Sequence, residues 1–202
     1  MHPHDTGHQY DAIASLWDEK RRTSQYGTTF LERAIALCGS RNRALDVGCG
    51  SGGPMIEKLI AAGFKVTGVD VSIAMLEIAK AKYPTVEFFH DDITQFETLL
   101  RFDLILAWDS IFHLPRGLHV PVIEKLCGFL TEGGVLLFSA GGIDTEIVGT
   151  MHGHEFHYSS LSDTTLLELI KRGGCVPVLM GRDQYPLHHL VIIGVKAGER
   201  AA

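Results

Sequence analysis

The sequence has little of what would tie it to a disulfide framework, a metal centre or a membrane. Its four cysteines form no CxxC pair, so neither a zinc knuckle nor a dithiol redox motif is indicated. No apolar run reaches the roughly 18 residues that a membrane-spanning helix needs. The first residues lack the apolar stretch of a secretory signal. We therefore expect a cytoplasmic protein with reduced thiols and no membrane partner.

Positive charge is not in excess either. The net charge is −6 with neutral histidines, from 18 Lys and Arg against 24 Asp and Glu. Such an acidic balance does not attract a phosphate backbone, so no nucleic acid partner is expected. Hydrophobic residues make up 46% of the chain and charged residues 21%, which excludes disorder over most of it. The 202 residues are the length of one ordinary domain, predicted over 1–202.

Strands and helices are predicted to alternate along most of the chain. The apolar periodicity predicts helices at 10–20, 28–37, 55–62, 73–82, 120–130 and 166–171, and strands at 44–47, 65–69, 86–90, 102–108, 135–139, 176–180 and 190–195. This alternation indicates a parallel sheet that is covered on both faces. The short connection before the last strand predicts an antiparallel hairpin at the sheet edge. The stretch 140–160 is too long for a plain connector, so we expect a functional loop there.

A glycine-rich turn, Gly48 to Gly53, joins the first predicted strand to a helix. It fits the GxGxxG pattern of dinucleotide sites, in which glycines let the backbone approach a ligand closely. However, Asp46 precedes the turn and would face the pyrophosphate of a dinucleotide. Asp70 ends the second strand, where a carboxylate usually binds a ribose diol. The two acids favour a ligand with a ribose, a positive group and no phosphate, such as S-adenosylmethionine.

The segment LDVGCGSGG at 45–53 resembles motif I of the class I methyltransferases that use S-adenosylmethionine. Later motifs of that family are resembled by VTGVDVS at 66–72, HDDITQF at 90–96, FDLILAWDSIFHLP at 102–115 and LTEGGVLLFS at 130–139. The resemblance implies an α/β fold, a three-layer αβα sandwich with a seven-stranded, mostly parallel sheet. Its implied strand order is 3-2-1-4-5-7-6, with strand 7 antiparallel. It also implies an N-terminal helical lid at 1–40, a cofactor-binding core at 41–140, a substrate-loop insertion at 141–160, and a C-terminal helix and hairpin at 161–196.

The same resemblance implies which residues bind the cofactor. Asp70 is expected at the ribose hydroxyls, Asp92 at the adenine amino group and Ile93 against the adenine ring. The full set of expected cofactor contacts is Tyr10, Asp46, Gly48, Cys49, Gly50, Gly52, Asp70, Val71, Asp92, Ile93, Ala107 and Trp108. The expected reaction is in-line transfer of the methyl group to an O, N or S atom of a small molecule, leaving S-adenosylhomocysteine. No Asn-Pro-Pro-Tyr or Pro-Cys segment follows the fourth strand, which disfavours amino-adenine, glutamine and cytosine C5 as acceptors.

Two residues after the fourth strand are candidates for catalysis. His113 is a candidate general base, because imidazole titrates near neutral pH. Orientation of a loop is the alternative role for His113. Asp109 is expected to hold the substrate or the cofactor's ammonium group, or else to cap the next helix.

Further candidates lie in the later part of the chain. His157, Tyr158 and Tyr185 are expected to contact the substrate. His157 also belongs to an HxHxxH run, but no carboxylate-rich shell accompanies it, so no metal is expected. Alternation along the last strand places one of His188 and His189 in the interior.

Other functions stay open at this point. The chain could be a non-catalytic S-adenosylmethionine-binding regulator or partner subunit, or a protein methyltransferase. An NAD-dependent oxidoreductase is a further alternative, against which Asp46 and the antiparallel sheet end argue. The partner expected here is a small-molecule methyl acceptor, and the protein is expected to be a monomer or a homodimer.

Overall fold

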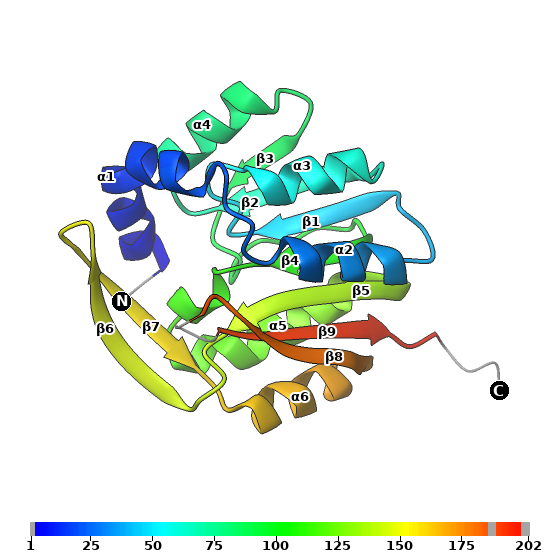
Figure 1. Ribbon diagram of the computed structural model, residues 1–202. Helices are drawn as coiled ribbons and strands as arrows, with labels where there is room; N and C mark the ends of the chain where they lie inside the picture. The colour runs from blue at the N-terminus through cyan, green and yellow to red at the C-terminus, as the bar shows by residue number, and fades with distance from the viewer. Residues whose placement is uncertain (1–2, 186–188, 199–202) are drawn as a thin grey trace.

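The computed structural model describes residues 3–185 and 189–198 and places seven strands in one twisted sheet (Figure 1). The order across the sheet is β3-β2-β1-β4-β5-β9-β8. These strands are β1 Arg43–Val47, β2 Lys65–Asp70, β3 Glu87–His90, β4 Phe102–Ala107, β5 Leu130–Ala140, β8 Cys175–Asp183 and β9 His189–Lys196. β1 to β5 run parallel, while β9 is antiparallel to both β5 and β8. The predicted strand order, with an antiparallel seventh strand between the fifth and sixth, is confirmed.

Helices cover both faces of the sheet, and β4 shows how one strand serves both layers. Leu104 and Leu106 pack with α2 and α3 on one face, while Ile105 points to α5 and α6 on the other. The helices are α1 Pro3–Arg21, α2 Thr28–Leu37, α3 Pro54–Ala61, α4 Ile73–Lys82, α5 His119–Phe129 and α6 Asp163–Arg172, with short 3-10 turns η1 Ile111–His113 and η2 Arg116–Leu118. Within the described residues no helix has the length and apolarity to cross a bilayer. The three-layer sandwich leaves the carboxyl ends of the parallel strands on one edge, under α1 (Figure 1).

α1 begins earlier than the sequence predicts. It starts at Pro3, whereas apolar periodicity predicts a start near residue 10. Contacts with distant residues hold the first turns of α1 in place, and the periodicity of apolar residues gives no sign of such contacts. At Gly7 the helix lies against the carbonyl group of Val71, so close that a Cβ would overlap the carbonyl oxygen. Asp11 accepts hydrogen bonds from the Ser72 hydroxyl at 2.6 Å and the Ala74 amide at 2.9 Å, which fixes α1 to the start of α4.

The loop expected at 141–160 is wrong in its secondary structure, because most of these residues lie in strands. They form a separate two-stranded antiparallel sheet, β6 Thr145–Met151 and β7 His154–Ser160. The turn between the strands places His152 and Gly153 at φ of 52° and 82°, as in the mirror-image turns that favour tight hairpins. The outer edge of β7 lies against η1, and Phe156 is fully buried there. This hairpin stands beside α1 at the open edge of the main sheet (Figure 1).

Candidate functional site

A cavity of about 1080 Å³, counting the open space at its mouth, lies over the carboxyl ends of the parallel strands. α1 forms its roof, and the helix positions that line it are Pro3, Thr6, Tyr10, Trp17 and Arg21. Their spacing of three, four, seven and four residues puts them on one face of the helix. Its lining combines apolar side chains with a few polar groups, as the sites of small-molecule ligands do.

The floor of the cavity is the glycine-rich turn between β1 and α3. Gly48, Gly50 and Gly52 have φ of 70°, 53° and 78°, values that residues with a Cβ atom rarely adopt. Asp70 at the end of β2 holds this turn by accepting from the Gly50 amide at 2.7 Å, and it also accepts from the Ser72 amide at 2.8 Å. The turn is therefore fixed from below by a carboxylate that itself lines the cavity.

Buried acids surround this floor. Burial, and next the charge of Asp70, raise the pKa of Asp46 to about 7. Burial also raises the pKa of Asp70 despite its hydrogen bonds from backbone amides. Asp92 is buried at the end of β3 and accepts from the Thr94 amide at 2.8 Å. Buried carboxylates without cationic partners favour a ligand that brings hydrogen-bond donors or positive charge.

Three residues that line the same cavity each have a buried polar side-chain atom with no hydrogen-bond partner among the described residues. The atoms are Thr6 Oγ1, Trp108 Nε1 and Ser110 Oγ. A buried polar group without a partner costs about 1–3 kcal/mol of stability. The presence of three such residues around one cavity fits a site that a polar ligand completes.

Tyr10 and His113 meet at one end of the cavity. The Tyr10 hydroxyl lies 2.9 Å from His113 Nε2, and His113 Nδ1 lies 3.0 Å from the carbonyl oxygen of His157. A carbonyl oxygen only accepts, so Nδ1 carries the proton and Nε2 accepts from Tyr10. Burial lowers the pKa of His113 to about 4 and raises that of Tyr10. The pair is therefore neutral near pH 7.

Asp109 follows β4 and is the centre of a second polar cluster, in a left-handed backbone conformation with φ of 50°. Its carboxylate accepts from Gln184 Nε2 at 2.7 Å and from His189 Nδ1 at 3.1 Å. Ser139 receives a hydrogen bond from the Asp109 amide at 2.8 Å and donates one to its carboxylate at 3.1 Å. Arg21 of α1 lies 3.6 Å from Oδ2. Side chains from α1, β5, β9 and the segment before β9 thus surround one carboxylate at the cavity wall.

The comparison with known proteins agrees with this geometry. Residues 44–134 match the family described as "Methyltransferase domain". A protein of Geobacillus sp. (strain WCH70) that is named as a methyltransferase is 34% identical over 139 residues, which are 64% of this chain and 56% of that protein. The 27-O-demethylrifamycin SV methyltransferase of Amycolatopsis mediterranei (strain S699) is 30% identical over 159 residues, which are 66% of this chain and 57% of that protein. The chain spans a little over half the length of these relatives.

A solved structure extends the likeness to almost the whole chain. The magnesium protoporphyrin IX methyltransferase of Synechocystis PCC 6803, solved with bound S-adenosylmethionine, superposes with a TM-score of 0.74. The two sequences are 16% identical, and the match covers 96% of each chain. Residues 44–134 therefore carry a methyltransferase domain, in a chain that has the fold of this enzyme. The cavity of this methyltransferase domain lies outside the carboxyl ends of the strands, where ligands bind in open α/β sheets.

Most residues that the sequence nominates line this cavity of the methyltransferase domain. Those that do are Tyr10, Asp46, Gly48, Cys49, Gly50, Gly52, Asp70, Val71, Asp92, Ile93, Trp108, Asp109 and His113. Ala107 is buried in β4 and is not among the lining residues. Asp109 does not cap η1, because the residue at that position is Ser110 and it makes no side-chain cap.

The predicted substrate residues lie elsewhere. His157 and Tyr158 line a second cavity of about 560 Å³ between the hairpin and η1, which shares His113 and Leu114 with the first. Tyr185 is 80% exposed and reaches neither cavity. His188 lies outside the described residues. Across residues 3–185 and 189–198, no group of three or more His, Cys, Asp or Glu is placed to hold a metal ion.

Sequence reasoning missed the partners of Asp109. Arg21, Ser139, Gln184 and His189 are spread over α1, β5 and the approach to β9, and no local motif joins them. Only the alternation of the last strand, which places one of two histidines inward, gave a signal for His189.

Proposed function

We propose that the methyltransferase domain binds S-adenosylmethionine in the cavity under α1 and transfers its methyl group to a small molecule. The observation that carries the proposal is the order of acids along one cavity, with Asp46 near the end of β1, Asp70 at the end of β2 and Asp92 just after β3. In this assignment Asp46 holds the ammonium group, Asp70 the ribose hydroxyls and Asp92 the adenine amino group. The glycine turn at Gly48 lets the backbone approach the ligand between them.

The polar atoms of the cavity fit this cofactor. Trp108 Nε1 can only donate, so it suits the carboxylate of the methionine part, while the hydroxyls of Thr6 and Ser110 can donate or accept. The raised pKa of Asp46 supports a cationic partner, because a bound ammonium group would favour the ionised carboxylate. When bound, the cofactor supplies an activated, electrophilic methyl group.

The residues of this chain would then position the acceptor and exclude water. α1 covers the cavity, and its Tyr10 side chain meets His113 in the cavity lining. His113 has a pKa near 4 and both ring nitrogens bonded, so it takes a proton only after Tyr10 releases Nε2. We propose that His113 orients the Tyr10 side chain and the edge of β7. It would accept a proton only when the Tyr10 hydroxyl has moved away from Nε2. In the same proposal, α1 acts as a lid over the cofactor, and residues 141–160 lie on the side where the methyl acceptor binds.

A small molecule is the acceptor that this architecture favours. α1 covers the cavity and packs against β7 of the hairpin, an arrangement that favours a small molecule over a protein chain, which would need an open groove. Two of the similar proteins are named for such compounds, 27-O-demethylrifamycin SV and magnesium protoporphyrin IX.

Calorimetric titration tests the cofactor assignment. Wild-type protein should bind S-adenosylmethionine and S-adenosylhomocysteine but not NADH. Asp70→Ala should weaken both adenosyl ligands by about tenfold to a hundredfold, because a charged hydrogen-bond acceptor is worth about 1.5–3 kcal/mol. Asp144→Ala, which removes an exposed carboxylate paired with Arg116, is the control and should bind normally.

The outcomes separate the alternatives. Binding of NADH alone would support an oxidoreductase and overturn the proposal. Binding of the adenosyl ligands without methyl transfer to any small molecule would support a regulator or partner subunit.

A further inference from the structure

We propose that Lys125 of α5 is a positioning residue for the adenine end of the cofactor site. Its ammonium group holds residues 92–97, the adenine segment, and thereby sets the preference for a purine with a 6-amino group. The inference rests on the proposed function, which places the adenine against Asp92 and Ile93. Lys125 itself is not among the residues that line the cavity, so it would act through the adenine segment and not by touching the ligand.

The adenine segment lies between β3 and β4 and belongs to neither strand. Bonds within it form a single turn, in which the carbonyl oxygen of Asp92 accepts from the amides of Gln95 and Phe96, both at 2.8 Å. The Thr94 amide donates to Asp92 Oδ1 at 2.8 Å. These local bonds give the turn its shape, but they do not place the turn relative to the sheet.

The Lys125 side chain connects this turn to α5. Its Nζ lies 2.9 Å from the carbonyl oxygen of Thr94, 3.1 Å from that of Phe96 and 3.4 Å from that of Ile93. The carboxylate of Glu97 lies 3.0 Å away. An ammonium group has three hydrogens and only donates, so it can serve several carbonyls that converge on one point. Because hydrogen bonds from a charged donor are about twice as strong as those between neutral groups, one side chain gives the turn three firm links to α5.

α5 is a fixed support for this side chain. Val122 and Leu126 of α5 are buried in the same apolar cluster as Phe96, whose ring packs edge-on against Phe129 at 6.3 Å. The Lys125 side chain is only 18% exposed, so water competes little for its ammonium group. Apolar burial has little directional preference, whereas hydrogen bonds weaken steeply when they are misaligned. The apolar contacts therefore hold the segment against α5, and Lys125 fixes the orientation of its backbone.

The backbone orientation of this segment places both expected adenine contacts. The carbonyl group of Ile93 is bonded to Lys125, while Ile93 is one of the residues that line the cavity. The Asp92 carboxylate is bonded to the Thr94 amide, and the carbonyl group of Thr94 is also bonded to Lys125. A shift of this backbone would move the ring contact and the acceptor for the amino group together.

The 6-amino group is where adenine differs from hypoxanthine, which carries a carbonyl oxygen at that position. A carboxylate oxygen accepts a hydrogen bond from the amino group but not from a carbonyl oxygen. A site that is built to bond one group rejects an analogue that lacks it, provided that the bonding atom stays in place. The place of the Asp92 carboxylate, and hence Lys125, should therefore determine the preference between the two bases.

Calorimetric titration of the full chain with S-adenosylhomocysteine and S-inosylhomocysteine tests the inference. Wild-type protein should bind the adenosyl ligand at least about tenfold more tightly. Lys125→Met should reduce this preference to about threefold or less, mainly by weakening S-adenosylhomocysteine. A residue with a merely structural role would weaken both ligands by the same factor and leave the ratio unchanged.

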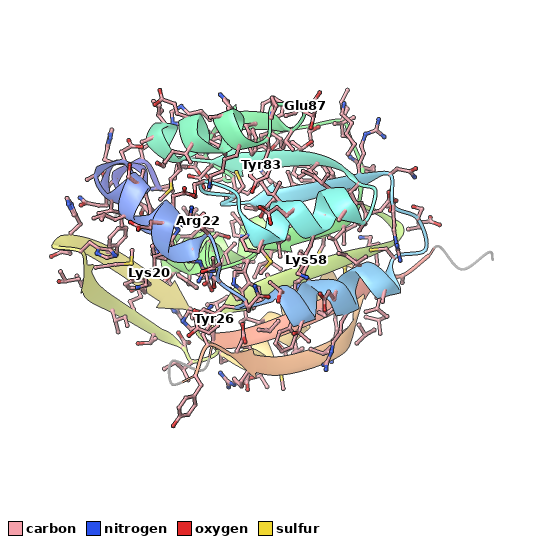
Figure 2. The ribbon with its side chains drawn as sticks, turned by 45° about the horizontal axis from the view of Figure 1, so that its top comes forward. Lys20, Arg22, Tyr26, Lys58, Tyr83 and Glu87 are labelled. Carbon is pink, nitrogen blue, oxygen red and sulfur yellow. The ribbon has the colours of Figure 1, made fainter. Side chains whose placement is uncertain are left out.

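Two control variants separate the bonds to the carbonyl groups from the ion pair. Glu97→Gln removes the carboxylate at Lys125, whose own side chain is 75% exposed, and should keep the wild-type preference. Lys58→Met removes an ion pair with Glu32 on the other face of the sheet and should also keep the preference. Lys58 projects from α3, across the sheet from α5 (Figure 2).

Lys125→Gln is a milder change that tests the inference even where Lys125→Met does not fold. The amide of glutamine is neutral and one bond shorter than the lysine side chain, so it cannot reach all three carbonyl oxygens, but it leaves a polar group beside them. The preference for the adenosyl ligand should fall by at least about threefold.

Three results would overturn the inference while sparing the binding of S-adenosylmethionine. They are equal binding of the two ligands by wild-type protein, a wild-type preference in Lys125→Met or Lys125→Gln, or a loss in Glu97→Gln as large as in Lys125→Met. Failure of wild-type protein to bind S-adenosylhomocysteine would overturn the proposed function and this inference together.

Discussion

Helix α1 approaches the β2–α4 turn at Gly7 so closely that a methyl group there has no space. A Cβ at Gly7 would overlap the carbonyl oxygen of Val71 and lie 2.9 Å from its carbonyl carbon. Carbon atoms in ordinary contact are about 3.5–4.0 Å apart, so α1 would have to move away by roughly 1 Å. Overpacking of this kind costs about 1–3 kcal/mol. Helix propensity alone predicts the opposite sign, a gain of about 0.5–1 kcal/mol for Gly→Ala inside a helix.

The chain offers a matched control for this change. Gly128 lies in α5, is exposed, and a Cβ there would meet nothing within 4 Å. Gly128→Ala should therefore raise the melting temperature by about 1–4 °C, because 1 kcal/mol corresponds to about 2–4 °C for a chain of this size. Gly7→Ala should lower it or leave it unchanged, and should weaken S-adenosylhomocysteine by about threefold to thirtyfold as the roof of the cavity shifts. Thermal unfolding and calorimetric titration measure the two effects. If Gly7→Ala stabilised as much as Gly128→Ala and bound the ligand normally, α1 would not be docked on Val71.

Three further predictions concern pH and the Tyr10–His113 pair. Because burial raises the pKa of Asp46 to about 7, the contribution of Asp46 to the stability of the ligand-free protein should fall as pH rises from about 4 to 7; this contribution should be absent from Asp46→Asn in urea unfolding, and the same pH dependence in both proteins would contradict the raised pKa. Because burial lowers the pKa of His113 to about 4, the contribution of His113 has the opposite sign and should fall as pH drops below about 6.5, since the unfolded chain then binds a proton that the folded chain does not. Tyr10→Phe removes the donor to Nε2 and should cost about 1–3 kcal/mol of unfolding free energy, whereas Tyr26→Phe, at an exposed position, should change little; equal losses would count against the Tyr10–His113 hydrogen bond.

The sheet and its helices are predictable from the sequence because their signals are local. The bounds of α2 and α4 agree with the apolar periodicity, and Ser72 caps α4 by accepting from the Met75 amide. The glycine turn and Asp70 follow adjacent parallel strands that one helix connects, so their proximity follows from the chain order. The strand order across the sheet came from a family resemblance, since periodicity does not say which strands pair.

What the sequence did not predict depends on contacts between distant segments. The first turns of α1 have no apolar stripe and form where Gly7 and Asp11 meet the β2–α4 turn. The His152–Gly153 turn was a local indication of the β6–β7 hairpin. The prediction of a long loop over this stretch did not use it. The residues that contact the Asp109 carboxylate lie up to 168 positions apart, from Arg21 to His189, and only the fold brings them together.

A crystal structure of the protein with S-adenosylhomocysteine is the most direct test of the central claim, the cofactor site under α1. The account predicts the ribose hydroxyls at Asp70, the adenine amino group at Asp92 and the ammonium group at Asp46. It also predicts that Trp108 Nε1 gains a hydrogen-bond partner from the ligand. A ligand found outside this cavity, or inside it with the adenine at Asp109, would contradict the account.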